Sequence, residues 1–256
     1  MATAFAQLLK GKGAARCVAT VKDPSQLHYF FDRSRSSPTV LFLGRANVGK
    51  SSLINKLVHR RSLVRSGQTA GLTKQLEFYG LGEPLRLFLV DAPGYGSRGR
   101  PEWGAMVDAY LDTKNNHLQR VYILLDFEHG LETKSDPGFL RYMNRRFEAA
   151  HGVGFTYQAV FTKFEGRDAT LHGQRVEDLR QEIQKMVPTC LPPIFTSARE
   201  GTGIDELQAS IGQACGLHEK AIYREEMERL ADFEIDDGVE YHHIAPRSPR
   251  PTRRAR

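Results

Sequence analysis

The stretch from Leu41 to Asn55 constrains the fold more than any other part of this chain. It starts with an apolar run, continues as Gly-x-x-x-x-Gly-Lys-Ser from Gly44 to Ser51, and ends in an amphipathic segment. A strand before this pattern and a helix after it are the context in which it binds phosphate, with Lys50 on the β- and γ-phosphates and Ser51 on Mg²⁺. Its glycines let backbone N–H groups converge on the anion, and the helix adds its positive N-terminal end. An ordinary glycine-rich turn is the weaker interpretation, because both flanking elements have the required type.

Apolar runs that suit strands alternate with amphipathic segments that suit helices over most of the chain. Strands are expected at residues 39–43, 74–79, 85–90, 121–125, 156–162 and 194–196, and helices at 51–61, 102–114, 139–150, 176–187 and 203–215. This alternation predicts an α/β fold with a mostly parallel six-stranded sheet and helices on both faces. Ligands of such sheets bind at the carboxyl ends of the strands. The residues that follow strand ends are therefore expected in one site: Gly44, Asp91, Lys163 and Ser197.

The formal net charge of +6 is concentrated at the two ends of the chain. Residues 247–256 hold five arginines and residues 1–22 hold four basic side chains, and neither segment has an acid. We therefore expect a basic N-terminal extension and connector at 1–37, a core domain at 38–216, and a surface helix with an arginine-rich tail at 217–256. The basic ends suit contact with a polyanion such as RNA, although solvated ends are an equal alternative.

Three cysteines without a C-x-x-C pair argue against a disulfide scaffold or a zinc site and favour a reducing compartment. No apolar run has the length of a membrane span. Phe5, Leu8 and Leu9 fall on one face of an N-terminal helix that is basic and free of acids, which resembles an organelle-targeting segment. A disordered basic N-terminus is the open alternative.

Four segments together resemble the EngB (YihA) family of ribosome-assembly GTPases: residues 44–55, 69–73, 91–96, and Thr162-Lys163 followed by Ser197-Ala198. Trp103 and the later Tyr110-Leu111 also match that family's pattern. The resemblance covers about residues 38–213, and its specific parts are 44–55 and 91–96. It implies a Ras-like P-loop GTPase fold that binds GTP or GDP with Mg²⁺.

The resemblance also implies the residues of the site. Those implied to bind nucleotide are Gly44, Arg45, Ala46, Asn47, Val48, Gly49, Lys50, Ser51, Ser52, Thr69, Gly71, Thr73, Asp91, Gly94, Thr162, Lys163, Glu165, Ser197 and Ala198. Those implied to act in catalysis are Asn47, Lys50, Thr73 and Gly94, and those implied to hold Mg²⁺ are Ser51, Thr73 and Asp91.

Several of these roles depend on the nucleotide state. The Gly94 N–H is implied to meet the γ-phosphate, so that its loop orders with GTP and relaxes with GDP. Thr73 is implied to complete the Mg²⁺ shell, with Thr69 as the alternative if the register differs. Asn47 matches an asparagine that coordinates K⁺ in related potassium-activated GTPases, which predicts K⁺ as a further cofactor. Tyr95 stands where Ras-like proteins carry the glutamine that orients water, so we expect slow unaided hydrolysis.

One position departs from the family pattern. The base-reading motif is Thr-Lys-x-Asp, whereas this chain has Thr162-Lys163-Phe164-Glu165. The usual aspartate accepts two hydrogen bonds from guanine, and the added methylene of Glu165 moves the acceptors by about 1 Å unless its rotamer folds back. Discrimination between guanine and adenine is a hydrogen-bond difference, so Glu165 puts it in question.

Two function classes follow. The first is a GTP-hydrolysing assembly factor for the large ribosomal subunit, in the mitochondrial matrix or otherwise in the cytoplasm. Its expected partners are rRNA at the basic ends and other assembly factors, and it would be a monomer away from the ribosome. The second is a scaffold that holds nucleotide, or none, and occupies an RNA particle without hydrolysis. A P-loop kinase is weaker, because no arginine-rich lid segment follows the switch signature at residues 91–94.

Overall fold

The structure is a computed structural model that describes residues 4–10, 14–33, 37–64, 75–95, 101–113, 117–132, 135–149, 154–165 and 169–217. The chain divides into two units, residues 1–219 and residues 220–256, and all described residues belong to the first. The helix expected from residue 218 and the arginine-rich tail lie outside the described residues. In the part of the chain that is described, no helix has the length and apolar character needed to cross a membrane.

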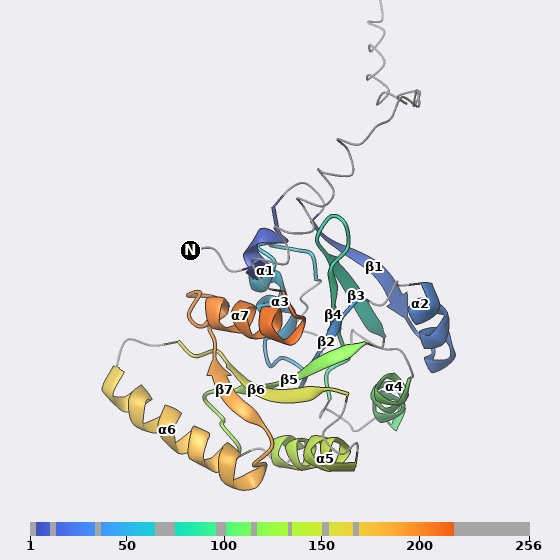
Figure 1. Ribbon diagram of the computed structural model, residues 1–256. Helices are drawn as coiled ribbons and strands as arrows, with labels where there is room; N and C mark the ends of the chain where they lie inside the picture. The colour runs from blue at the N-terminus through green and yellow to red at the C-terminus, as the bar shows by residue number, and fades with distance from the viewer. Residues whose placement is uncertain are drawn as a thin grey trace, which may run out of the picture. The chain divides into compact units, whose positions relative to one another are not determined.

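A single sheet forms the centre of the described unit (Figure 1). Its order is β1-β3-β4-β2-β5-β6-β7, in which β1 and β3 pair antiparallel, as do β3 and β4, and all other neighbours are parallel. The strands are β1 Ala15–Val21, β2 Thr39–Gly44, β3 Leu76–Leu81, β4 Leu87–Asp91, β5 Leu118–Asp126, β6 Thr156–Thr162 and β7 Leu191–Phe195. Every residue of β2 and β4 is buried, as parallel strands covered on both faces require.

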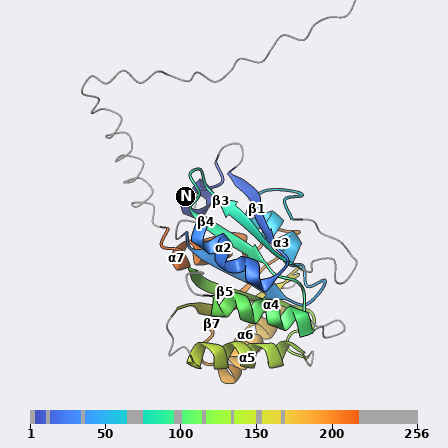
Figure 2. The ribbon, with the colours of Figure 1, turned by 90° about the vertical axis from the view of Figure 1, so that its right-hand side faces the viewer.

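Helices cover both faces of this sheet, as Figures 1 and 2 show. They are α1 Ala4–Gln7, α2 Leu27–Arg33, α3 Lys50–Leu57, α4 Pro101–Asp112, α5 Ser135–Ala149, α6 Ala169–Met186 and α7 Ile204–Ala214, with a short 3₁₀ turn at Pro24–Gln26. The main apolar cluster joins the sheet to α2, α4, α5 and α6, whereas α1 and α3 pack with α7. The α/β fold and the five helices expected after residue 50 are confirmed, and so is the antiparallel pair β3 and β4.

The expected count of six strands is wrong by one, because residues 15–21 form the edge strand β1. β1 pairs with β3 from Ala15 opposite Leu81 to Val21 opposite Leu76, with an irregularity between Cys17 and Ala19. The following helix α2 also packs into the apolar cluster through buried Leu27 and Phe31. The segment that composition marks as a basic extension and connector therefore contributes to the sheet and its core.

Candidate nucleotide-binding site

The glycine-rich turn lies between the end of β2 and the start of α3, as the sequence predicts. Asn47 has φ 65° and Gly49 has φ 100°, so the chain passes through the left-handed region just before Lys50 begins α3. A Cβ at Gly44 would lie 2.8 Å from Val48 Cγ1 and 2.9 Å from Leu124 Cβ. Only glycine fits that position, which lets the turn fold back toward the helix N-terminus and present its N–H groups to an anion.

Lys50, at the end of this turn, forms a buried ion pair with Asp91 at the end of β4. The Lys50 Nζ donates to Asp91 Oδ1, while Asp91 Oδ2 has no hydrogen-bond partner among the described residues. Burial raises the pKa of the Asp91 carboxyl, and the Lys50 ammonium opposes that rise. A buried carboxylate oxygen without a partner is costly, and a hard cation is the kind of group that would satisfy it.

These residues therefore fit Mg²⁺. Ser51, the second residue of α3, and Asp91, the last residue of β4, would hold the ion. When bound, Mg²⁺ neutralises charge on the phosphates. Thr73, the third predicted ligand, lies outside the described residues, as do Thr69 and Gly71.

The segment after Asp91 lies directly against the P-loop. The Tyr95 N–H donates to Gly44 O and the Ala46 N–H donates to Tyr95 O, both at 3.1 Å. A Cβ at Gly94 would lie 2.8 Å from the backbone N of Ala46, so glycine is required for this approach. The predicted γ-phosphate sensor, Gly94, is thus held beside the turn that is predicted to bind the phosphates.

Tyr95 is directed to α5. Its buried ring stacks on Phe139 with centroids 4.7 Å apart, and its hydroxyl donates to Asp136 Oδ1 at 3.1 Å. Burial, followed by the charge of Asp136, raises the pKa of the Tyr95 phenol well above its usual value. The phenol therefore stays protonated and engaged with α5, which agrees with the expectation that it does not replace a water-orienting glutamine.

The strand ends of β6 and β5 hold the expected base-reading residues in place. Thr162 Oγ1 lies 2.6 Å from Val48 O and 3.1 Å from Leu125 O, so this hydroxyl connects β6 to the P-loop. Lys163 has φ 58°, and its ammonium lies 2.6 Å from Asp126 Oδ2. The other oxygen of Asp126 accepts from the Glu128 N–H at 3.0 Å and so shapes the loop after β5.

Glu165 lies beside the second base-reading segment. Its Oε1 is 3.4 Å from the Ser197 hydroxyl, and its Oε2 is 3.4 Å from Arg199 Nη1. The Phe164 N–H donates to Thr196 O at 3.0 Å, which joins the two loops through the backbone. The residues predicted at the strand ends are thus brought to one edge of the sheet, with Ala198 next to Ser197.

The comparisons with known proteins agree with this geometry. A family described as "50S ribosome-binding GTPase" matches residues 39–152. The probable GTP-binding protein EngB of Nitrobacter hamburgensis is 35% identical over 187 residues, which are 71% of this chain and 82% of that protein. The EngB of Mesorhizobium japonicum is 36% identical and is matched over 68% of this chain and 84% of its own length.

The chain belongs to the EngB family of GTP-binding proteins. Membership makes it a GTPase whose cofactors are GTP or GDP and Mg²⁺. This confirms the resemblance stated from the sequence and agrees with the P-loop, Lys50 and Asp91 seen in the structure.

Solved structures show the same fold as this EngB-family chain. A probable GTP-binding protein engB has a TM-score of 0.52 and 20% identity, over 70% of this chain and all of that one. Era, solved with MgGDPNP and part of 16S ribosomal RNA, has a TM-score of 0.51 and 21% identity, over 70% of this chain and 56% of Era. Toc33 of Arabidopsis thaliana has a TM-score of 0.56 at 14% identity, over 84% of this chain and 93% of that one. At these identities the likeness concerns the fold, which is that of the Ras-like GTPases.

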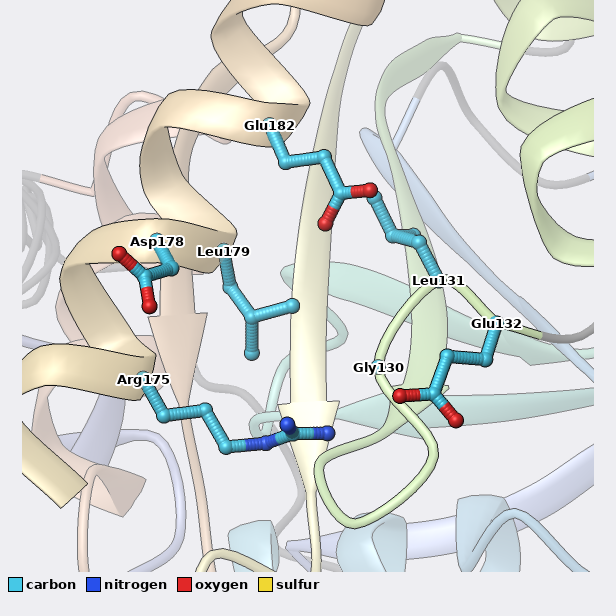
Figure 3. A pocket seen from close by; sticks show the side chains of 7 residues that line it. All are labelled: Gly130, Leu131, Glu132, Arg175, Asp178, Leu179 and Glu182. Atoms are coloured by element: carbon cyan, nitrogen blue, oxygen red, sulfur yellow. The ribbon is translucent and has the colours of Figure 1, made fainter. Parts of the chain in front are cut away.

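A separate cavity of about 160 Å³ lies between α6 and the loop after β5 (Figure 3). It is lined by Gly130, Leu131, Glu132, Arg175, Asp178, Leu179 and Glu182. Figure 3 shows Arg175 reaching from α6 toward the Gly130 loop, where it donates to Glu128 O at 2.7 Å and to Phe127 O at 3.2 Å. The arginine holds the loop that directly follows Asp126, the residue that pairs with Lys163.

Sequence reasoning missed Asp136, the second residue of α5. Its carboxylate accepts from Tyr95 and lies 3.9 Å from Arg45 Nη1. The available signal was an Asp-Pro pair at the start of a helix, which indicates a helix boundary and no partner.

Proposed function

We propose that this EngB-family GTPase acts in assembly of the large ribosomal subunit of mitochondria. The observation that carries the proposal is the match of residues 39–152 to a family described as "50S ribosome-binding GTPase". The relatives that match the chain are probable GTP-binding proteins EngB of bacteria. The mitochondrial part of the proposal rests on the basic, acid-free N-terminal segment of the sequence.

The basic ends supply the proposed contact with rRNA. Five arginines in residues 247–256 can neutralise phosphates, and such contacts weaken steeply as salt rises. In this proposal the GTPase unit reports the nucleotide state, other assembly factors respond to it, and the protein is a monomer away from the ribosome.

We also propose that K⁺ activates hydrolysis. Asn47 is held in the left-handed region at the tip of the P-loop, one residue from Val48, whose carbonyl is tied to Thr162. A K⁺ ion held there would add positive charge near the phosphates, as an arginine finger does. Faster hydrolysis in KCl than in NaCl is expected, and loss of that difference in Asn47→Ala would place the effect at this residue. Equal rates in the two salts for the unaltered protein would contradict the proposal.

Sedimentation with isolated mitochondrial ribosomal subunits tests the main proposal. The full chain with a non-hydrolysable GTP analogue is expected to move with the large subunit, and the chain with GDP to remain largely free. A variant in which the five arginines of residues 247–256 are replaced by glutamine should bind more weakly and with a smaller salt dependence. Equal binding to both subunits, or binding that ignores the nucleotide, would contradict the proposal. Import of the full chain into the matrix tests the location separately.

A further inference from the structure

A buried carboxylate at the start of α5 contacts both halves of the phosphate site. Asp136 is 1% exposed. One of its oxygens accepts from the Tyr95 hydroxyl at 3.1 Å, and the other lies 3.9 Å from the Arg45 guanidinium. Arg45 follows the first glycine of the P-loop, and Tyr95 follows Gly94. A single side chain thus spans the two segments that are implied to meet the phosphates.

The backbones of the same two residues are paired. Arg45 and Tyr95 form a parallel bridge, with hydrogen bonds from the Tyr95 N–H to Gly44 O and from the Ala46 N–H to Tyr95 O. Gly94 is the residue just before this bridge, and a Cβ on it would meet Ala46 N at 2.8 Å. The position of the Gly94 N–H therefore depends on the stability of the backbone bridge between Arg45 and Tyr95.

Asp136 is suited to hold that bridge. A carboxylate buried to this degree is stable only with hydrogen bonds and a compensating charge, and Tyr95 and Arg45 supply these. The raised pKa of Tyr95 keeps its hydroxyl protonated, so it remains a donor over the physiological range. Phe139, one turn further along α5, stacks on the Tyr95 ring and fixes the direction of the phenol.

We propose that Asp136 is a positioning residue that holds Arg45 and Tyr95 together and thereby keeps the Gly94 N–H in place for the γ-phosphate. The nucleotide state then affects α5. When the contact between the γ-phosphate and the Gly94 N–H is lost, the segment of Gly94 and Tyr95 becomes less firmly held, and this segment contacts Asp136 of α5. This inference rests on the GTPase activity of the family and does not depend on the ribosomal role.

Two conservative variants of the full chain test it: Tyr95→Phe, which removes the hydroxyl and keeps the stacked ring, and Asp136→Asn, which removes the charge and keeps the acceptor. Dissociation constants for GDP and for a non-hydrolysable GTP analogue are measured with Mg²⁺ present. Each variant is expected to bind the analogue about tenfold more weakly and GDP within about twofold of the unaltered protein, because Tyr95→Phe loses a hydrogen bond to a charged group and Asp136→Asn loses the charge that faces Arg45. Because both variants weaken the hold of the same carboxylate on the bridge, the double variant should lose less than the product of the two effects.

Tyr142→Phe is the matched control. Tyr142 lies on the same helix, and its hydroxyl donates to Asp108 of α4, so this variant removes the same kind of bond away from the P-loop. It is expected to leave the ratio of the two dissociation constants unchanged. Equal weakening of GDP and analogue by the Tyr95 and Asp136 variants, no weakening at all, or an equal change in the control would each overturn the proposal. Failure of the unaltered protein to bind either nucleotide would instead contradict the assignment as a GTPase.

Discussion

Glu165 shows how a one-carbon difference is accommodated at the base-reading loop. Its carboxylate lies 3.4 Å from both the Ser197 hydroxyl and Arg199, and the Ser197 hydroxyl in turn accepts from the Glu200 N–H at 3.0 Å. Arg199 is largely exposed, so its ion pair with Glu165 is weak. The neighbouring loop therefore contacts the longer side chain of Glu165 without fixing it firmly in one position.

Glu165→Asp is expected to raise the preference for GDP over ADP by about tenfold, because the shorter side chain matches the family's usual acceptor position. Equilibrium binding of both nucleotides measures it. Arg199→Ala is the control, because it removes the ion pair with Glu165 and leaves the length of the Glu165 side chain unchanged. It should change the preference for GDP over ADP by less than about twofold. Glu165→Gln, which loses the carboxylate, should bind GDP at least about tenfold more weakly. A drop in preference on Glu165→Asp would contradict this account of the loop.

Asp91 predicts a pH dependence of Mg²⁺ use. Burial raises the pKa of its carboxyl, so protons compete with Mg²⁺ at a higher pH than for an ordinary aspartate. The gain in GDP affinity on adding Mg²⁺ is therefore expected to be smaller at a mildly acidic pH than at neutral pH, because the metal needs the ionised carboxylate. Asp91→Asn is the control for protonation of the nucleotide itself. In this variant, adding Mg²⁺ should increase the GDP affinity little at either pH. A Mg²⁺ gain in the unaltered protein that is the same at both would contradict the prediction.

Local patterns predicted candidate site residues that lie on contiguous motifs, and they could not predict the long-range contacts that the structure shows. Lys50 and Asp91 follow from spacing after a strand, because motif chemistry fixes both. The contact of Asp136 with Tyr95 joins residues 41 positions apart, and the pairing of Glu165 with Arg199 joins residues 34 apart. Nothing in the sequence near either residue marks its partner, since the packing of α5 and of the loop after β7 decides these contacts.

Among the elements, α7 depends on one glycine that joins it to the sheet. Gly203 precedes the helix with φ 67°, and a Cβ there would lie 1.9 Å from Phe195 O at the end of β7. That oxygen belongs to the backbone, so no side-chain rotation relieves the clash. The helix itself covers the sheet through buried Leu207 and Ile211.

Gly203→Ala is expected to lower the free energy of unfolding by more than about 2 kcal/mol, from the left-handed backbone and the clash together. Chemical denaturation measures it. Gly173→Ala is the control, because Gly173 lies inside α6 and a Cβ added there would meet nothing within 4 Å. That change should stabilise the protein by about 0.5–1 kcal/mol, since glycine is a poor helix former. Equal effects at the two positions would contradict the assigned role of Gly203.

Strong periodic patterns predicted most elements, whereas the edge strand β1 was not found. β2, β4, β5 and β6 are apolar runs that are buried on both faces of the sheet. Such runs indicate strands from the local sequence alone. β1 is buried at its two ends and mostly exposed in between, with Ala19 partly buried, and its sequence carries the charge of Arg16. Pairing with β3 stabilises it, and such tertiary stabilisation of a weak local pattern does not appear in the sequence.

At the scale of the whole molecule, the N-terminal segment belongs to the folded unit. Phe5 in α1 is fully buried and Leu8, just after this helix, is nearly so, and α1 packs against α7, near the opposite end of the described chain. Two of the three residues on the apolar face that the sequence assigns to an organelle-targeting helix, Phe5 and Leu8, are buried here. Any processing that removed residues 1–22 would also remove β1 and leave β3 as an exposed edge.

Phe5→Ala is therefore expected to destabilise the whole unit by about 3 kcal/mol, as deletion of a buried aromatic side chain does. Tyr29→Ala is the matched control: Tyr29 is an aromatic residue of the same N-terminal region but is 66% exposed, so its removal should change stability by less than about 0.5 kcal/mol. Denaturation followed through the single tryptophan and by circular dichroism measures both. A Phe5 variant as stable as the unaltered protein would mean that the folded unit does not need α1. The N-terminal segment could then serve as a cleavable targeting sequence. Loss of stability in the Phe5 variant alone would mean that the first turn of the chain is a structural part of the GTPase.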